Sequence, residues 1–178
     1  RVRGCICRVQ QDFVGDRKCD FPLENCLMIY ESERPPSPDD ISKDQALAIL
    51  DETEKIGLVH TTANVMNEIA YVCNCCGCCC EAMLAARRFG PLNSVHTTNF
   101  LPSLDSDKCK GCGKCVSVCP VEAMLLTSAN DPKKPKIKKS KLDEDRCLGC
   151  GVCARACPSD AIELKSRPVR VITPYDSA

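Results

Sequence analysis

Aromatic side chains are scarce in this chain of 178 residues: Phe, Trp and Tyr make up 4% of it, and tryptophan is absent. A conventional large aromatic core is therefore not expected, and metal ligation would replace part of it. Histidine occurs only as His60 and His96, far apart in sequence, and we interpret both as surface or satisfied polar residues rather than catalysts. No glycine-rich nucleotide-binding spacing or P-loop occurs, so a bound nucleotide or flavin has no support.

An excess of charge of one sign is also missing, because 24 Lys and Arg balance 24 Asp and Glu. The whole chain therefore gives no case for binding nucleic acid or a charged membrane surface. No apolar run approaches about 18 residues, so no membrane span is predicted. The chain starts at Arg1 rather than Met, which fits a processed product or the later part of a longer polypeptide.

Cysteine, in contrast, is abundant, with 18 residues. That fraction can mark a disulfide scaffold, but no secretory signal is visible, and we expect a reducing compartment, the cytoplasm. The cysteines of the second half follow one spacing twice: Cys109-x2-Cys112-x2-Cys115-x3-Cys119-Pro120, then Cys147-x2-Cys150-x2-Cys153-x3-Cys157-Pro158. Three thiolates at every third position let one loop wrap a single [4Fe-4S] core, and the fourth thiolate must come from elsewhere.

This doubled run resembles that of the bacterial-type two-cluster ferredoxins, in which the last cysteine of each motif ligates the other cluster. The resemblance implies two [4Fe-4S] clusters, one held by Cys109, Cys112, Cys115 and Cys157, the other by Cys147, Cys150, Cys153 and Cys119. It also implies an α+β fold for residues 101–178, a ferredoxin-like βαββαβ-type domain with two antiparallel hairpins and short helices after Cys115 and Cys153. The flanking residues repeat as well, including Gly111, Gly113, Gly149 and Gly151, which indicates an internal duplication.

Residues 1–100 are expected to form an irregular, helix-containing, cysteine-rich lobe. Residues 1–30 read as loop-rich, and a proline-dense connector follows at residues 34–40. Ser42 and Gln45 form a capping box that predicts a helix ending near Gly57. Short strands are predicted at residues 58–60 and 69–72, and a helix at residues 81–89.

The segment from Cys73 to Cys80 contains six cysteines in eight residues. Within it Cys73, Cys76 and Cys79 repeat the first three ligands of a ferredoxin loop, whereas the other three cysteines are out of phase. Because neighbouring side chains diverge, we expect either one idle set or two metal centres, with Cys5, Cys7, Cys19 and Cys26 as the remote ligands; the alternative is that several are buried, inert thiols. Three or four clusters in total are then predicted.

The first half also resembles a cysteine-rich accessory iron–sulfur domain of ferredoxin-like proteins of anaerobes. The resemblance rests on three segments in order, residues 5–8, 20–26 and 73–80, and implies no defined activity. Cys75-Cys76-Gly77 matches a triplet of heterodisulfide-reductase-like proteins, although the run of cysteines after it departs from that pattern.

We therefore predict an electron-transfer protein, most simply a non-catalytic oxidoreductase subunit, that relays single electrons through its clusters to or from a redox enzyme of an anaerobe. A low-potential donor and a tungsten or molybdenum oxidoreductase are the expected partners. The alternatives are a catalytic subunit acting on disulfides or sulfur compounds through the segment Cys73–Cys80, or a redox sensor. Six lysines between residues 131 and 141 would steer an acidic partner, or simply form a solvated loop.

Overall fold

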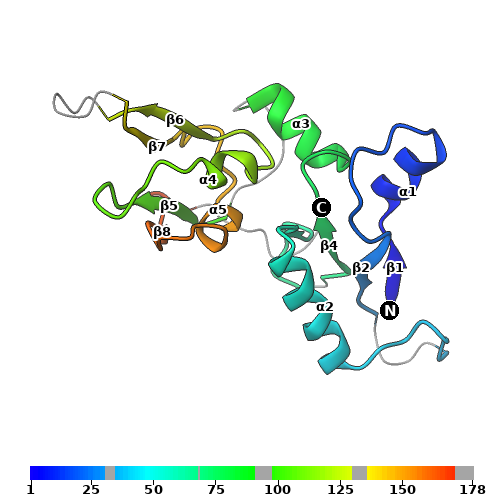
Figure 1. Cartoon of the computed structure of the whole chain (residues 1–178). Helices are drawn as coiled ribbons and strands as arrows, with labels where there is room; N and C mark the ends of the chain where they lie inside the picture. Colours follow the sequence, from blue (N-terminus) through cyan, green and yellow to red (C-terminus); the bar gives the residue numbers. More distant parts are fainter. Residues whose placement is uncertain (31–34, 68, 91–97, 130–135, 171–178) are drawn as a thin grey trace. The chain divides into compact units, whose positions relative to one another are not determined.

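The computed structural model describes residues 1–30, 35–67, 69–90, 98–129 and 136–170. The chain divides into two compact units, the first formed by Arg1–Glu81 and the second beginning at Ala82 (Figure 1). Each unit contains helices and strands, which confirms the expected mixture of α and β structure. In the described ranges, no helix combines the length and apolar character needed to cross a membrane.

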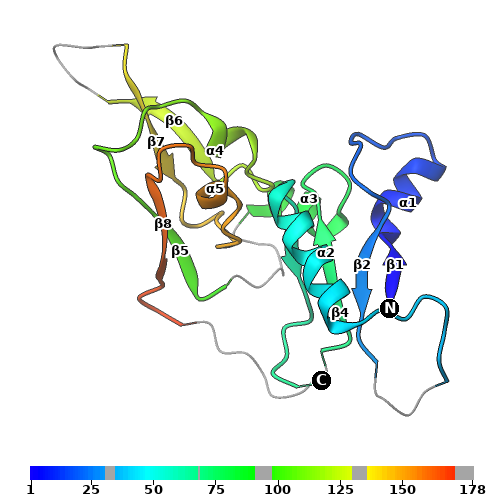
Figure 2. The same cartoon turned by 60° about the horizontal axis from the view of Figure 1, so that its bottom comes forward.

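The first unit is built on a four-stranded sheet with the strand order β1-β2-β4-β3, antiparallel throughout. Its elements are β1 (Val2–Gly4), α1 (Ile6–Phe13), β2 (Glu24–Met28), α2 (Lys43–Lys55), β3 (Val59–Thr61) and β4 (Tyr71–Cys75). The strands β1 and β2 run side by side in Figure 2. The prediction that residues 1–30 are loop-rich is therefore wrong. The reason is that β1 and β2 stabilise each other by pairing Arg3 with Cys26, a contact between distant residues that no local pattern reveals.

The helix α2 begins and ends as its sequence predicts. The Ser42 side chain accepts a hydrogen bond from the backbone N–H of Gln45 at 3.2 Å, and the Gln45 side chain accepts one from the backbone N–H of Ser42 at 2.8 Å. Gly57 follows the helix with a φ of 85°, the left-handed conformation that suits glycine. The strand expected at residues 69–72 begins later, at Tyr71, and continues into the cysteine-rich segment as far as Cys75.

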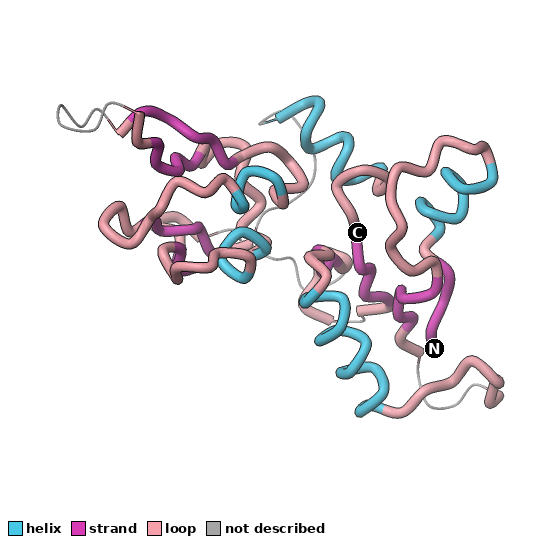
Figure 3. Tube along the Cα trace, in the orientation of Figure 1, coloured by secondary structure: helices cyan, strands magenta, loops and turns pink. Residues whose placement is uncertain are grey.

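The second unit has a β-α-β-β-α-β order after α3, as the sequence predicts. The elements are α3 (Glu81–Phe89, beginning at the last residue of the first unit), β5 (Phe100–Leu104), α4 (Lys114–Ser117), β6 (Met124–Ser128), β7 (Lys138–Leu142), α5 (Val152–Arg155) and β8 (Ile162–Ser166). β5 pairs with β8 and β6 with β7, in two antiparallel two-stranded sheets (Figure 3). The expectation of two antiparallel hairpins is therefore wrong for β5 and β8, because they are the first and last strands of the unit and not consecutive ones. The short helices contain Cys115 and Cys153 instead of following them, because the left-handed Gly113 and Gly151 start each helix one residue before the cysteine.

The core of the second unit is formed by residues from both halves of the repeat. Cys115 and Met124 from the first half pack with Cys153 and Ile162 from the second half, and all four are buried. Cys119 and Cys157 pack against the same cluster. The last two cysteines of each motif therefore lie around one shared core.

Candidate metal centres

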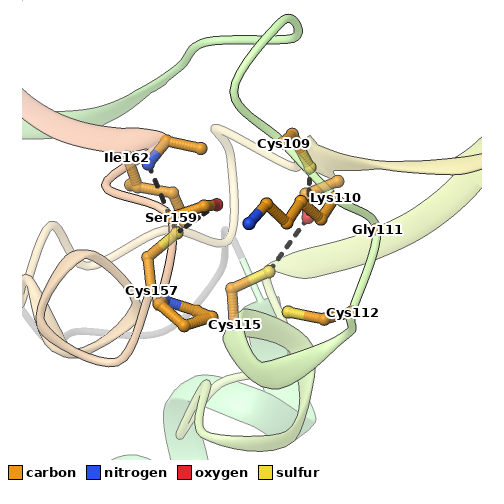
Figure 4. Close-up of a pocket in the computed structure, with 11 residues that line it drawn as sticks. Cys109, Lys110, Gly111, Cys112, Cys115, Cys157, Ser159 and Ile162 are labelled. Atoms are coloured by element: carbon orange, nitrogen blue, oxygen red, sulfur yellow. Dashed lines mark hydrogen bonds between the residues drawn. The ribbon is translucent and has the colours of Figure 1, made fainter.

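Four predicted ligands of the second unit line one hollow of about 280 Å³, a volume that includes its open side. Figure 4 shows three of them, Cys109, Cys112 and Cys115, on the loop and first turn of α4, and the fourth, Cys157, arriving from the segment after α5. Cys115 is buried, whereas Cys112 is exposed to solvent. The structure thus brings together the set that the crossed pattern of two-cluster ferredoxins implies, and we call this hollow the first pocket.

The other four cysteines of the second unit line a hollow of nearly the same size, about 300 Å³. Cys147, Cys150 and Cys153 come from the second motif, and Cys119 comes from the end of the first motif. This second pocket therefore repeats the three-plus-one arrangement of the first with the two halves exchanged.

Glycine is required where each loop passes an adjacent strand. A Cβ built on Gly111 would lie 2.1 Å from the carbonyl oxygen of Lys138, and one built on Gly149 would lie 2.2 Å from that of Phe100. Both glycines have positive φ, 65° and 70°, which a side chain would strain further. The repeated glycines therefore let each cysteine loop lie directly against the end of a strand.

Backbone N–H groups point at cysteine sulfurs at matching places in both halves. Ala123 donates to Cys119 Sγ at 3.2 Å, and Ala161 donates to Cys157 Sγ at 3.4 Å. Burial raises the pKa of Cys157, but hydrogen bonds from the backbone N–H groups of Ser159 and Ala161 outweigh it and lower the pKa of the thiol. Such donors favour a thiolate, the form that binds iron.

The two pockets differ in polarity at equivalent positions of the repeat. Ser140 lies seven residues before Cys147, and its hydroxyl is 3.0 Å from Cys115 Sγ in the first pocket; Pro102, seven residues before Cys109, occupies that place in the second. Ser159, whose hydroxyl is 3.7 Å from Cys157 Sγ, is likewise replaced by Val121. The first pocket therefore offers hydroxyl groups where the second offers only carbon.

A lysine adds to this difference. Lys139 Nζ donates to the carbonyl oxygens of Ser106 and Cys109, at 2.6 Å each, and so fastens the loop of the first pocket. The equivalent residue of the other half is Leu101. Lys139 thus has a local structural role within the lysine-rich segment.

The pKa values of the thiols also differ between the two pockets. Burial raises the pKa of Cys109, but hydrogen bonds from Ser140 and Gly111 and the charge of Lys139 outweigh it and lower that pKa. In the second pocket, burial raises the pKa of Cys150 to about 11 and that of Cys153 to about 12. The first pocket therefore stabilises negative charge better than the second.

The donor set of both pockets fits an iron–sulfur cluster. Each pocket presents four thiols around a hollow, and the described residues that line it include neither a carboxylate nor an imidazole. All-thiolate ligation of this kind is what [4Fe-4S] clusters use.

The comparisons with known proteins agree with this donor set. The family of 4Fe-4S dicluster domains matches residues 108–161. Residues 108–161 are a 4Fe-4S ferredoxin-type domain. The chain is 31% identical over 78 residues to a subunit of the ion-translocating oxidoreductase complex of Methanosarcina acetivorans, a match covering 42% of this chain and 27% of that protein. It is 38% identical over 50 residues to ferredoxin-3 of Nostoc sp., covering 28% of this chain and 50% of that ferredoxin. The chain thus spans half or less of these curated relatives.

In the first unit, one group of four cysteines has closely spaced sulfurs. The sulfurs of Cys19, Cys76, Cys78 and Cys79 all lie within 4.8 Å of one another. The expected ligands of the segment Cys73–Cys80 are Cys73, Cys76 and Cys79, and Cys78 belongs to the out-of-phase set that the sequence leaves as either idle or part of a second centre. The expectation that neighbouring cysteines diverge is wrong for Cys78 and Cys79, whose sulfurs are 3.8 Å apart, because the chain turns here instead of continuing as a strand.

The remaining six cysteines of the first unit form a second group, which we call the sheet cysteines: Cys5, Cys7, Cys26, Cys73, Cys75 and Cys80. Interactions between side chains connect them in series, from Cys5 through Cys26, Cys73, Cys75 and Cys80 to Cys7. Of the predicted set Cys73, Cys76 and Cys79, the structure therefore brings the last two together with Cys19, and places Cys73 among the sheet cysteines. Of the four predicted remote ligands, Cys5, Cys7 and Cys26 also lie there.

A buried arginine lies between the two groups. Arg8 on α1 has no exposed surface, and its guanidinium donates to the carbonyl oxygen of Asn74 at 3.0 Å and to the side-chain oxygen of Asn25. Burial alone would lower the pKa of Arg8, but the sulfurs of Cys5 and Cys76 raise it. No sequence pattern assigned a function to this residue.

Proposed function

We propose that the chain is an iron–sulfur electron-transfer protein that holds one [4Fe-4S] cluster in each pocket of its second unit. The observation that carries this proposal is the crossed arrangement of ligands around one core. Cys115 and Cys157 of the first pocket and Cys119 and Cys153 of the second all pack in the same cluster of buried side chains. Two redox centres bound there would be close neighbours, which is what exchange of electrons between them requires.

Each pocket would bind its [4Fe-4S] cluster through four thiolates and provide backbone N–H donors to the ligand sulfurs. A bound [4Fe-4S] cluster would supply one-electron chemistry. All-thiolate ligation favours a low reduction potential, as in the plant-type [2Fe-2S] ferredoxins at about −400 mV. The N–H groups of Ala123 and Ala161 stabilise negative charge on the ligand sulfurs in both pockets. The shared core excludes water from the buried sides of the ligands.

The polar groups of the first pocket make it the easier one to reduce. Hydrogen bonds and positive charge near the ligand sulfurs favour the more negative, reduced state and raise the reduction potential. Ser140, Ser159 and Lys139 provide them in the first pocket. An electron entering the second pocket would therefore move to the first.

The partner that we propose is a redox enzyme, within a complex that the chain joins as a subunit. One relative is named as a subunit of an ion-translocating oxidoreductase complex, which supports a place in a redox assembly. Lys136, Lys138 and Lys141 are exposed beside the first pocket's loop and would guide an acidic partner; Lys133 and Lys134 lie outside the described residues. A tungsten or molybdenum partner, an anaerobic host, the cytoplasm and a domain boundary at residue 100 stay predictions from the sequence.

Clusters beyond the first two would have to be held by the first unit. The sheet cysteines supply enough thiols for a third cluster, so three clusters stay a prediction. The structure does not support the alternative function of disulfide cleavage. In the triplet Cys75-Cys76-Gly77, Cys76 belongs to the group of Cys19, whereas Cys75 is one of the sheet cysteines.

Anaerobic purification followed by iron and sulfide analysis and a redox titration monitored by EPR tests this function. Two clusters predict at least about eight sulfides per chain and reversible one-electron reduction at low potential. Cys112→Ser, at an exposed ligand position on the loop before α4, should lower the iron and sulfide contents and slow electron exchange with a low-potential dye. Ser117→Ala, on α4 itself, should leave all three unchanged. A folded protein without sulfide, or clusters that cannot be reversibly reduced, would contradict the proposal.

A further inference from the structure

The four sulfurs of Cys19, Cys76, Cys78 and Cys79 have the spacing of ligands around one metal ion. With metal–sulfur bonds of about 2.3 Å, as in zinc–thiolate sites, the sulfurs of a regular tetrahedron lie about 3.8 Å apart. Cys19 Sγ lies 4.0 Å from Cys76 Sγ and 3.7 Å from Cys79 Sγ, and the sulfurs of Cys78 and Cys79 are 3.8 Å apart. The group therefore approaches the edge lengths of a four-thiolate tetrahedron.

This arrangement differs from that of the pockets in the second unit. There, four thiols line a hollow of about 280 or 300 Å³, a volume that includes the open side of each pocket. In the group of Cys19 the sulfurs approach one another directly. A single ion fits between them, whereas a [4Fe-4S] core would have to push them apart.

Local structure explains how three of these ligands converge. β4 ends at Cys75, and the chain then turns through Gly77, with the N–H of Cys80 donating to the carbonyl oxygen of Cys76 at 3.4 Å. Leu58 packs with Cys76 and Cys79, which have exposed fractions of 3% and 0%. Cys19 and Cys78 are half-buried. A closed set of four protein ligands is typical of structural metal sites rather than catalytic ones.

Two arginines provide the charge that such a site needs. Four thiolates around a divalent ion carry a net charge of −2, which a buried site must balance. Arg8 is fully buried, its guanidinium faces Cys76, and no carboxylate of the described part of the chain forms an ion pair with it. Its Nε has no hydrogen-bond partner. Arg17 interacts with Cys19. These two arginines therefore place positive charge beside Cys76 and Cys19, where a four-thiolate site would need it.

We propose that Cys19, Cys76, Cys78 and Cys79 bind one tetrahedral divalent metal ion, Zn²⁺ or Fe²⁺, which fastens the loop of Cys19 to the turn after β4. The role of the ion is structural, because binding it stabilises the folded arrangement of two segments far apart in sequence. This site is independent of the two clusters in the second unit. It also limits any further cluster to the sheet cysteines.

The test compares metal and sulfide contents of the anaerobically purified full chain and of two variants. Cys78→Ser should lose about one metal ion per chain and no sulfide, because a single-ion site contains no inorganic sulfur. Zinc and iron are measured separately, so the lost element identifies the ion. Cys7→Ser, a change to a half-buried sheet cysteine, should retain that ion.

Three results would overturn the single-ion site. Parallel loss of about four irons and four sulfides in Cys78→Ser would show a cubane, and an unchanged metal content would show no site. X-ray absorption at the zinc edge of the unmodified chain does not depend on the folding of a variant, and should show four sulfur neighbours at about 2.3 Å. If the ion is iron, the unmodified chain should instead show mononuclear high-spin iron by Mössbauer spectroscopy; absence of both signals refutes the proposal. Failure here leaves the sulfide of the second unit, and thus the proposed function, untouched.

Discussion

The hydroxyl of Ser140, on β7, lies 3.0 Å from the sulfur of Cys115, on α4. This contact has no counterpart in the other half of the repeat, because Pro102 stands at the position equivalent to Ser140. When Cys115 is a thiolate, the hydroxyl is the donor and stabilises its negative charge. The two halves of the repeat thus share their cysteines but differ in the groups that surround them. This difference would give clusters in the two pockets different reduction potentials.

Replacing Ser140 by alanine should lower the potential of the first pocket and leave the second unchanged. A hydrogen bond contributes about 1 kcal/mol, which corresponds to a fall of about 40 mV for a one-electron couple if the bond acts mainly in the reduced state. An EPR-monitored redox titration of the full chain measures both potentials. Ser117→Ala is the matched control, because the Ser117 hydroxyl donates to the carbonyl oxygen of Lys114 and not to a sulfur. An equal shift in both potentials would show that the asymmetry does not come from Ser140.

Pairs of serine substitutions test the crossed ligand sets. Cys112 and Cys157 line the same pocket, so the double variant Cys112→Ser/Cys157→Ser should lose about four irons and four sulfides at most, no more than one cluster contains. Cys119 lines the other pocket, and Cys112→Ser/Cys119→Ser should therefore lose up to about eight of each. Iron and sulfide analysis separates the two results. If the pairs behave in the opposite way, each motif supplies all four ligands of its own cluster and the crossed arrangement is wrong.

Gly111→Ala should destabilise the second unit and reduce occupancy of the first pocket. The added Cβ would lie 2.1 Å from the carbonyl oxygen of Lys138, so the loop must move away from β7 in addition to bearing the strain of a positive φ. The strain alone costs about 1–2 kcal/mol, and the collision adds to it. Urea unfolding under anaerobic conditions measures the free energy, and iron analysis the occupancy.

Gly15→Ala is the control for that experiment. Gly15 has a similar φ of 73°, but a Cβ there would meet no atom within 4 Å. It should therefore show only the cost of the strained backbone, with unchanged iron content. Equal losses of stability in both variants would mean that the loop of Gly111 can move without cost.

The grouping of eight cysteines around two pockets could be expected from sequence, because each motif is local and repeated and the resemblance to two-cluster ferredoxins implies the exchange of the fourth cysteine. The difference between the pockets was also readable, since aligning the two halves places Ser140 opposite Pro102. The first unit was harder, because its structure depends on distant contacts. Arg3 pairs with Cys26 across a sheet, and the loop of Cys19 meets a turn almost sixty residues away. The direction of the Cys78 side chain depends on that turn, and no spacing of cysteines encodes it.

Arg8, which is buried on α1, connects this helix to two strands of the first unit. Its guanidinium donates to the carbonyl oxygen of Asn74 on β4 and to the side chain of Asn25 on β2, while the side chain of Asn74 donates to the carbonyl oxygen of Asn25. Removing the guanidinium would take its donor from the buried carbonyl oxygen of Asn74 and from the side-chain oxygen of Asn25, and would remove the positive charge beside the neighbouring sulfurs. Such a loss typically costs about 3–5 kcal/mol.

Arg8→Met, which keeps much of the side-chain volume, should therefore lower the free energy of unfolding of the first unit by about that amount and reduce the metal content of the Cys19 group. Arg8→Lys should retain only part of the stability of the unmodified chain, because a single ammonium group cannot reach both asparagines with the geometry of the planar guanidinium. Anaerobic urea unfolding and metal analysis measure the two effects. Arg3→Ala serves as the control: Arg3 forms an exposed ion pair of 2.7 Å with Asp39, which contributes at most about 1 kcal/mol. If Arg8→Met were no more destabilising than Arg3→Ala, the sulfurs that Arg8 faces would be neutral thiols, since uncharged sulfur needs no buried cation beside it.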